Sequence, residues 1–156
     1  MWIISAIFGF YIQDKRVTRT VYIEVARKNG KTAFIAAIQL YMLIADGENG
    51  AECDFLANNA KQAKIAFDMC SNFLASIDSK GKYFKRYRDY IKFDKTKSFI
   101  QVLSSEASGL DGFNAYSWVL DECHEQKDSR LYDVMNSSQG MRENPLGMII
   151  TTAGFN

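Results

Sequence analysis

A strand-like apolar segment followed closely by a helix-like apolar segment restricts the fold of this chain more than any other feature. Residues 17–25, VTRTVYIEV, are rich in β-branched side chains and predict a strand. Residues 32–46, TAFIAAIQLYMLIAD, are apolar on nearly all sides and predict a buried helix, with Gly47 as its C-terminal stop. Only the short stretch between them can form a loop.

The same alternation continues along the rest of the chain. Further strands are expected at 51–57, at 115–120, at 146–154, and as a pair around a polar turn within 90–103; helices are expected at 60–77, capped by Asn58 or Asn59, and at 128–139. Strands separated by helices imply a mostly parallel sheet covered on both faces. We therefore predict a three-layer α/β fold in a single domain of residues 1–156, whose 47% hydrophobic content is enough for a core.

Two apolar runs and three cysteines indicate in which cellular compartment the protein is expected. Residues 1–11 and 34–45 are both shorter than the roughly 20 residues that a membrane helix needs, so no membrane partner is expected. The three cysteines are odd in number and widely spaced, which favours reduced thiols in an intracellular protein. The net charge of +1 neither favours nor excludes an anionic partner, because local clustering decides that question.

The loop itself, VARKNGKT at 25–32, ends like a phosphate-binding loop, although Val25 occupies the place of the usual first glycine. Backbone N–H groups before a helix N-terminus form a cradle for anions. In such a site Gly30 lets the backbone approach the phosphates, Lys31 neutralises the β/γ oxygens, and the Thr32 hydroxyl ligates Mg²⁺. The alternative is an ordinary turn with a lysine at the start of a helix.

A second motif lies in YSWVLDE, residues 116–122, where an apolar strand ends in two carboxylates. Asp121 would hold Mg²⁺ through its water shell, and Glu122 would orient and deprotonate the attacking water. Two solvated acids at the start of a loop are the alternative interpretation. Because each motif follows a predicted strand and the two complement each other chemically, we favour an ATPase of the P-loop NTPase class.

Three weaker signals accompany these motifs. The strand MIITTAG, 148–154, ends in small hydroxyl residues that could lie beside a γ-phosphate. The segment 80–97 interleaves eight Lys/Arg with five aromatic residues. It could contact a nucleic-acid backbone through Lys85, Arg86 and Arg88. Alternatively, it could be a solvated hairpin whose aromatic side chains pack inward. The single histidine, His124, directly follows Cys123, a spacing that does not suit zinc, so a structural or hydrogen-bonding role is expected.

Together these residues resemble one known family, the ATPase domain of the large terminase subunit of tailed bacteriophages. The resemblance rests on ARKNGKT (26–32), ANNAKQA (57–63), SSEASGLDGFNAYSWVLDECHE (104–125) and RENPLGMIITTAG (142–154). Large terminases commonly lack the first loop glycine and carry an arginine in the loop, as this chain does. The resemblance implies a P-loop ATPase of the additional-strand, catalytic-glutamate type, which works as a ring on the portal protein with the small terminase subunit, in the host bacterial cytoplasm, and pumps double-stranded DNA into procapsids.

The resemblance also assigns roles by position. Lys31 and Thr32 match the phosphate and metal ligands of a loop that also contains Lys28 and Asn29, and Asp121 and Glu122 match the Mg²⁺ ligand and the catalytic base. Thr151, Thr152 and Gly154 match a motif that couples hydrolysis to motion. Arg27 matches the loop arginine, as a cis-acting finger or a γ-phosphate sensor. Arg142 is a weaker candidate for reaching a neighbouring subunit's nucleotide; otherwise it is a solvated arginine before a turn.

Two features depart from the family pattern. The chain starts Met1-Trp2-Ile3 without a convincing copy of the family's adenine-contacting segment, which usually contains a glutamine. The family continues into an RNase H-like nuclease domain, whereas these residues stop at Asn156, so we expect a fragment without nuclease activity. Two alternatives stay open, another P-loop ATPase that acts on nucleic acid and a nucleotide-binding assembly module without turnover in isolation.

Overall fold

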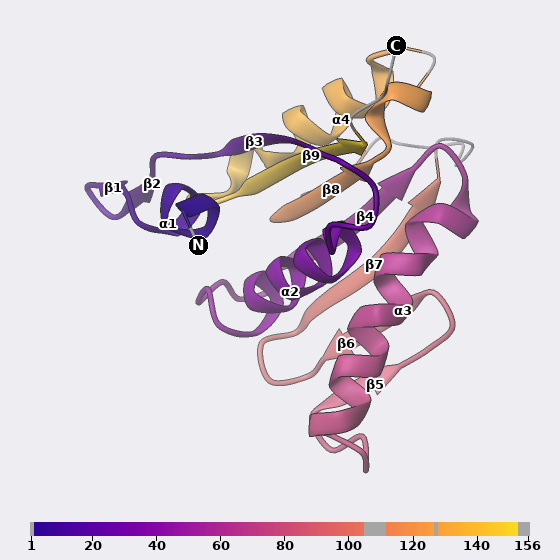
Figure 1. Ribbon diagram of the computed structural model, residues 1–156. Coiled ribbons are helices and arrows are strands. Elements are labelled where there is room, and N and C mark those ends of the chain that lie inside the picture. The colour runs from indigo at the N-terminus through magenta and orange to yellow at the C-terminus, as the bar shows by residue number, and fades with distance from the viewer. Residues whose placement is uncertain (1, 105–111, 127, 153–156) are drawn as a thin grey trace.

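The computed structural model describes residues 2–104, 112–126 and 128–152 (Figure 1). The helices are α1 (Trp2–Phe8), α2 (Lys31–Ile44), α3 (Ala60–Ile77) and α4 (Arg130–Ser138), with 3-10 turns η1 (Cys123–Glu125) and η2 (Gln139–Met141). The strands are β1 (Tyr11–Ile12), β2 (Lys15–Arg16), β3 (Thr20–Val25), β4 (Glu52–Ala57), β5 (Phe84–Arg86), β6 (Tyr90–Phe93), β7 (Ser98–Ser104), β8 (Ser117–Asp121) and β9 (Leu146–Thr152).

A seven-stranded sheet forms the centre, in the order β3-β9-β8-β4-β7-β6-β5. The five strands from β3 to β7 are parallel to one another, whereas β6 pairs antiparallel with β7 and β5 pairs antiparallel with β6. Strand β9 lies between β3 and β8, so a strand is inserted between the one before the loop and the one that ends in the acids. The predicted additional-strand α/β fold with a mostly parallel sheet is confirmed.

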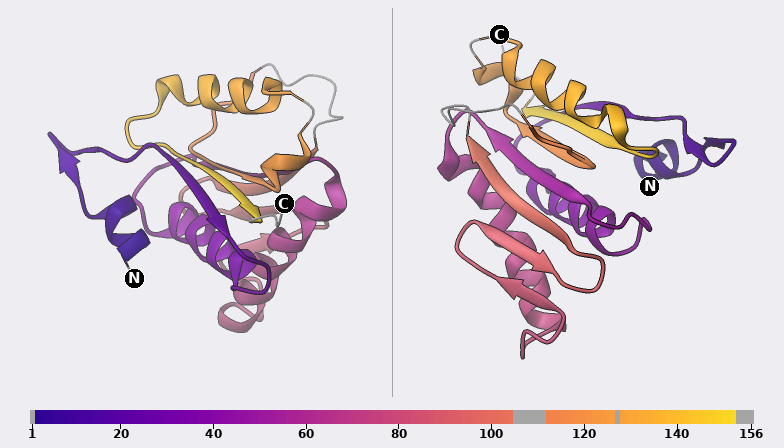
Figure 2. Two further views of the ribbon diagram at one scale, coloured as in Figure 1. Left: turned by 45° about the horizontal axis from the view of Figure 1, so that its top comes forward. Right: turned by 180° about the vertical axis from the view of Figure 1, so that it is seen from behind.

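Helices cover both faces of this sheet (Figures 1 and 2). Helices α2 and α3 pack on one face, where the larger group of buried apolar side chains lies. On the other face, Leu131 and Met135 of α4 pack in a second group with Trp118 and Leu120 of β8. A Cβ on Gly147 of β9 would lie 2.4 Å from the Trp118 ring, so only glycine leaves room for this indole against the sheet.

Helix α2 is buried as predicted, but it ends earlier. The carbonyl oxygen of Tyr41 accepts hydrogen bonds from the backbone N–H groups of both Ala45 and Asp46, which closes the helix at Ile44. Gly47 adopts a left-handed φ of 94° in the turn beyond and is not the direct stop, contrary to the prediction. The Asn59 cap of α3 is confirmed, since its Oδ1 accepts from the Gln62 N–H at 3.0 Å. Within the described residues no helix combines the length and apolarity that a membrane crossing requires.

Two small parts of the fold have no counterpart in the prediction. The first is the N-terminal unit, in which α1 and the β1–β2 hairpin are tied to the body by Arg16, whose guanidinium is buried beside Asp46. The second is β5, which pairs with β6 so that the rings of Phe84 and Phe93 stack 4.8 Å apart. Both parts consist of short elements, so too few residues repeat in them to give a periodic signal.

Candidate active site

The C-terminal ends of β3, β8 and β9 meet at one edge of the sheet because the three strands are parallel and adjacent. Val25 of β3 pairs with Thr152 of β9, and Asp121 of β8 pairs with Ile150. Helix α2 starts at this same edge with Lys31. Strand ends at such an edge are where open α/β sheets bind ligands.

Lys31 joins the two sequence motifs directly. Its Nζ lies 3.0 Å from Asp121 Oδ1, 2.5 Å from Glu122 Oε1 and 3.2 Å from Thr152 Oγ1. The lysine and the glutamate are 91 positions apart in the chain. The loop after β3 and the acids after β8 therefore form one cluster, together with the end of β9.

The loop has the backbone geometry of an anion cradle. Gly30 is the N-cap of α2 with a left-handed φ of 71°, a conformation that glycine adopts without strain. Gly30 has no side chain that could cap α2, so it leaves the N–H groups of the first turn, which point towards the loop, without a cap of its own. Lys28 is also left-handed, with φ 66°, which is uncommon for a residue with a side chain. Asn29 donates from Nδ2 to the Ala26 carbonyl at 3.2 Å and so fixes the loop from within.

Glu122 is held in a strained and highly specific position. Its φ is 51°, in the left-handed region that side chains rarely occupy. Thr152 donates to this carboxylate from its backbone N–H, 3.2 Å from Oε2, and from its hydroxyl, 2.8 Å from Oε1. The Glu122 N–H in turn donates to Asp121 Oδ1 at 2.9 Å. The end of β9 thus fixes the direction of this carboxylate.

The electrostatics of the cluster favour charged Lys31 and Glu122. Burial lowers the pKa of Lys31, but hydrogen bonds and charges from Glu122 and Asp121 outweigh it and leave that pKa raised. Burial alone would raise the pKa of Glu122, but hydrogen bonds from Lys31 and Thr152 outweigh it and lower that pKa. For Asp121, burial is the strongest influence and raises the pKa despite the nearby ammonium of Lys31. At neutral pH Glu122 is therefore a carboxylate, as a general base requires.

A cavity of about 490 Å³ opens beside this cluster. The loop and the first turn of α2 form one wall, including Arg27, Lys28 and Thr32, and Glu122 and Thr152 form part of another. Asn29 does not line it. Gln62 and Met69 of α3 and His124 of η1, which had no predicted site role, also line the cavity. The only sequence signal for Gln62 was its place in the stretch 57–63, because isolated polar or sulfur-containing residues look like surface or core positions.

The donor groups at this edge suit a magnesium ion. The Asp121 carboxylate lies at the end of β8, and Thr32 lines the cavity at the start of α2. Mg²⁺ prefers oxygen ligands and keeps several waters, so one carboxylate and one hydroxyl beside a phosphate cradle are an appropriate set.

The remaining motif residues lie in different parts of the molecule. Thr151 is buried at the end of β9, whereas Gly154 lies outside the described residues.

Arg142 lies at the opposite end of the sheet, where its Nη1 is 2.6 Å from Glu48 Oε1 and its Nη2 donates to the Gly50 carbonyl at 2.8 Å. The interpretation of Arg142 as a solvated arginine is wrong, because its side chain is only 10% exposed and is bonded within its own chain.

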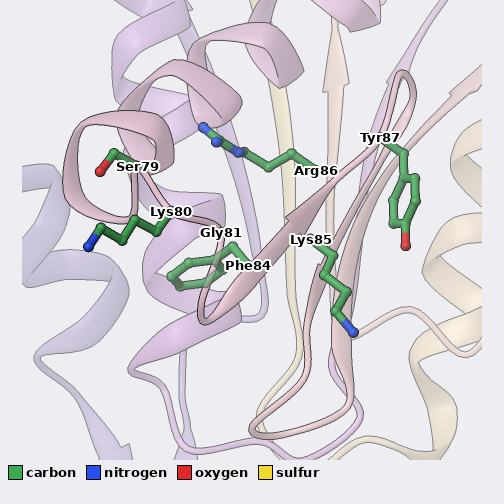
Figure 3. A pocket seen from close by; sticks show the side chains of 7 residues that line it. All are labelled: Ser79, Lys80, Gly81, Phe84, Lys85, Arg86 and Tyr87. Atoms are coloured by element: carbon green, nitrogen blue, oxygen red, sulfur yellow. The ribbon is translucent and has the colours of Figure 1, made fainter.

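The basic segment 80–97 contains β5, the outermost strand on one side of the central sheet, and its neighbour β6. Lys85 and Arg86 point in different directions from β5 (Figure 3). Lys85 pairs with Asp94 at 2.9 Å, and the half-buried Arg86 donates to the Ser71 carbonyl of α3 at 3.4 Å. Arg88 is exposed and lies 3.6 Å from an Asp89 oxygen. The three side chains therefore do not form one continuous basic face.

Comparison with known proteins places the chain in a family. The family described as "Terminase large subunit, ATPase domain" matches residues 1–156. The terminase large subunit of Lactococcus phage p2 is 22% identical over 164 residues, which cover 99% of this chain and 30% of that protein. The chain thus spans about 30% of the length of the curated relatives that it matches.

Solved structures share the fold. A crystal structure of the large terminase of bacteriophage HK97 matches with a TM-score of 0.76 and 24% identity, covering 86% of this chain and 29% of that one. The ATPase domain of the large terminase of Thermus phage P74-26 matches with a TM-score of 0.70 and 18% identity, covering 88% of this chain and 61% of that one. With the family match over its whole length, the chain belongs to the terminase large subunit ATPase domain family.

Proposed function

We propose that this chain binds ATP with Mg²⁺ at the cavity beside Lys31 and hydrolyses it. The observation that carries the proposal is the meeting of Lys31, Asp121 and Glu122 at the C-terminal ends of parallel strands. A phosphate cradle, a cation, a metal-binding carboxylate and a base are the parts that phosphoryl transfer to water requires.

Each residue has a role in this proposal. The loop N–H groups and Lys31 hold the phosphates, and Thr32 and Asp121 hold Mg²⁺, which would neutralise charge on the phosphate oxygens. Glu122 orients a water molecule and accepts its proton. Arg27, on the cavity wall, approaches the γ-phosphate as a finger or a sensor.

The ion pairs of the cluster describe a resting arrangement. Lys31 cannot neutralise a phosphate while its ammonium is held between Asp121 and Glu122. Arrival of a triphosphate would draw the lysine away, because several phosphate oxygens could replace its two carboxylate partners. The same movement would release Glu122 from its strongest partner and make it available to water, so ATP binding itself would activate the base.

The wider role follows from the family. We propose that the chain is the ATPase part of a DNA-packaging motor, in which a ring of subunits on the portal protein works with the small terminase subunit in the host cytoplasm, transiently docked on the procapsid. Thr151, Thr152 and Gly154 would couple turnover to movement of double-stranded DNA. We assign no nuclease chemistry to residues 1–156, which we regard as a single ATPase domain of a longer protein.

Two substitutions test hydrolysis. Glu122→Gln should lower ATP turnover by about 1,000-fold or more while nucleotide binding persists, because the amide cannot accept the proton of the water. Lys31→Ala should lose both binding and turnover. Glu143→Gln and Lys95→Ala are matched controls, since both residues are exposed and lie away from the cavity. Equal turnover of the wild type and both site variants would exclude the assignment.

DNA contact by the basic segment needs a separate test. We propose contacts from Lys85 and Arg88, with Arg86 mainly bonded to α3. The double change Lys85→Ala and Arg88→Ala should reduce stimulation of ATP turnover by DNA, and the loss should be greater at low salt than at high salt. The charge-matched control is Lys15→Ala with Arg130→Ala, two exposed residues outside the segment. DNA stimulation unchanged relative to that control would remove the segment from the DNA path.

A further inference from the structure

His124 makes a contact that the catalytic scheme above does not use. It lies in η1, immediately after the strand that ends in the acids, and its imidazole faces the cavity. Its Nδ1 lies 2.7 Å from Thr151 Oγ1 and 3.4 Å from Glu122 Oε2. One ring nitrogen thus stands between the catalytic carboxylate and the end of β9.

The two oxygen atoms near Nδ1 indicate which ring nitrogen of His124 carries the hydrogen. The Glu122 carboxylate accepts hydrogen bonds from Lys31 Nζ and from the N–H and hydroxyl of Thr152, and an ionised carboxylate can only accept. The contact to Glu122 is therefore favourable only when Nδ1 carries hydrogen. The same N–H can point at Thr151 Oγ1, whose hydroxyl is buried on the sheet. In the Nδ1–H tautomer the N–H donates to Thr151 Oγ1 and its hydrogen also lies on the side of the Glu122 carboxylate, 3.4 Å from the nitrogen. In the Nε2–H tautomer Nδ1 would accept from the Thr151 hydroxyl and would present a lone pair near the carboxylate.

Strand β9 then has two successive links to the acid-bearing turn. Thr152 donates hydrogen bonds to Glu122 from its N–H and its hydroxyl. Thr151 is hydrogen-bonded to His124, which lies two residues after Glu122. Since β9 lies between β3 and β8, any displacement of its end relative to β8 must stretch both links. A change in the bonding of Glu122 is transmitted to β9 by the same two links.

We infer that His124 is a positioning residue that joins the Glu122 carboxylate to Thr151 through its Nδ1–H, so that the base and the end of β9 adopt their working positions together. The inference rests on the proposed ATPase function for its kinetic consequences. The hydrogen bond itself is independent of that function.

Kinetics separate this role from a general packing role. His124→Asn places an amide where Nδ1 lies and should keep kcat within about 3-fold of the wild type. His124→Gln extends its amide to the region of Nε2, and His124→Ala has none, so both should lower kcat by about 10-fold with little change in KM for ATP. Thr151→Val should resemble His124→Ala, and the double variant should be no worse than either single variant. The inference is overturned if the Asn, Gln and Ala variants are all as active as the wild type. It is also overturned if all three variants lose activity to the same extent.

A direct observation of the imidazole uses the fact that His124 is the only histidine in the chain. Histidine labelled with ¹⁵N gives a single pair of ring signals, whose shifts report which nitrogen carries hydrogen. We expect the Nδ1–H form in the wild type at a pH where the ring is neutral, and a change towards Nε2–H in Thr151→Val. A dominant Nε2–H form in the wild type, or signals identical in Thr151→Val, overturns the inference.

The two proposals fail in different ways. If Glu122→Gln and the wild type turn over ATP equally, the proposed function is wrong, and the ¹⁵N signals still decide whether the link exists. If Glu122→Gln is inactive while the His124 variants match the wild type, hydrolysis stands and the role of His124 is removed.

Discussion

Both ends of the central sheet hold a basic side chain against acids, but they do so in different ways. At the C-terminal ends of the strands, Lys31 lies between Asp121 and Glu122, the three side chains are 13–16% exposed, and Lys31 and Glu122 line a cavity. At the opposite end, the Arg16–Asp46 pair has side chains that are 0% and 4% exposed, and Asp46 also accepts from the Tyr116 hydroxyl. One group can reach solvent and a ligand, and the other cannot.

The difference shows how similar ion pairs can serve a site or a fold. The lysine is a point charge on a flexible stem and can exchange its carboxylate partners for phosphate oxygens. The guanidinium of Arg16 is planar, buried and packed on the Phe8 ring at 4.7 Å, so it has no alternative partner without opening the structure.

The largest effect that tests this comparison is expected at the buried pair. Arg16→Met should lower the free energy of unfolding by about 3–5 kcal/mol, because it leaves the Asp46 charge buried without its cation. Lys15→Met, at the exposed neighbouring position, is the control and should change little. Urea unfolding measures both. A loss below about 1 kcal/mol would mean that the pair does not fix the N-terminal unit to the body.

A smaller effect, of a different kind, is expected at the cavity. Lys31→Met should change the unfolding free energy of the free chain by less than about 1 kcal/mol, since water can enter beside the acids. The same variant should lose the stabilisation by ATP with Mg²⁺, which for the wild type is about 2.7 kcal/mol at a hundredfold excess over Kd. Thermal unfolding with and without nucleotide measures both quantities. A large loss without nucleotide would show that Lys31 supports the fold as Arg16 does.

The smallest effect is expected at Asp54, a buried acid of β4 with no ion-pair partner among the residues that the structure describes. Burial is the main cause that raises its pKa well above the ordinary 3.8, and Gln101 donates to its Oδ1 at 2.9 Å. Since the folded state holds this proton more tightly than the unfolded state, its contribution to stability is greatest below pH 3.8 and falls as the pH rises above it.

Asp54→Asn should therefore gain stability relative to the wild type as the pH rises from 4 to 7. The net gain is reduced because the new amide N–H groups are themselves buried. Unfolding measured in parallel across this pH range gives the difference, and Asp68→Asn on the exposed surface of α3 is the control. A difference that does not vary with pH would mean that Asp54 ionises in the folded chain as it does in the unfolded one.

Much of the fold and part of the site could be predicted from local sequence. The strands before the loop and before the acids, the buried helix after the loop, and the Asn59 cap follow from patterns of two to four residues that are repeated over short ranges. Helix α1, the β1–β2 hairpin and β5 could not be predicted in this way. Each is short: the N-terminal unit depends on the contact of Arg16 with Asp46, 30 positions further along the chain, and β5 on its pairing with β6 through Phe84 and Phe93.

By itself the sequence determined that this chain alternates strands and helices and that a phosphate-type loop and a pair of acids each follow a strand. Only the tertiary structure decided that Lys31 contacts both acids, that Lys85 and Arg86 diverge, that Arg142 lies at the other end of the sheet, and that His124 reaches Thr151. The reason is physical: side-chain periodicity is set by neighbours along the chain, whereas these contacts depend on the order in which strands pair. Insertion of β9 between β3 and β8 brings the three motifs to one edge.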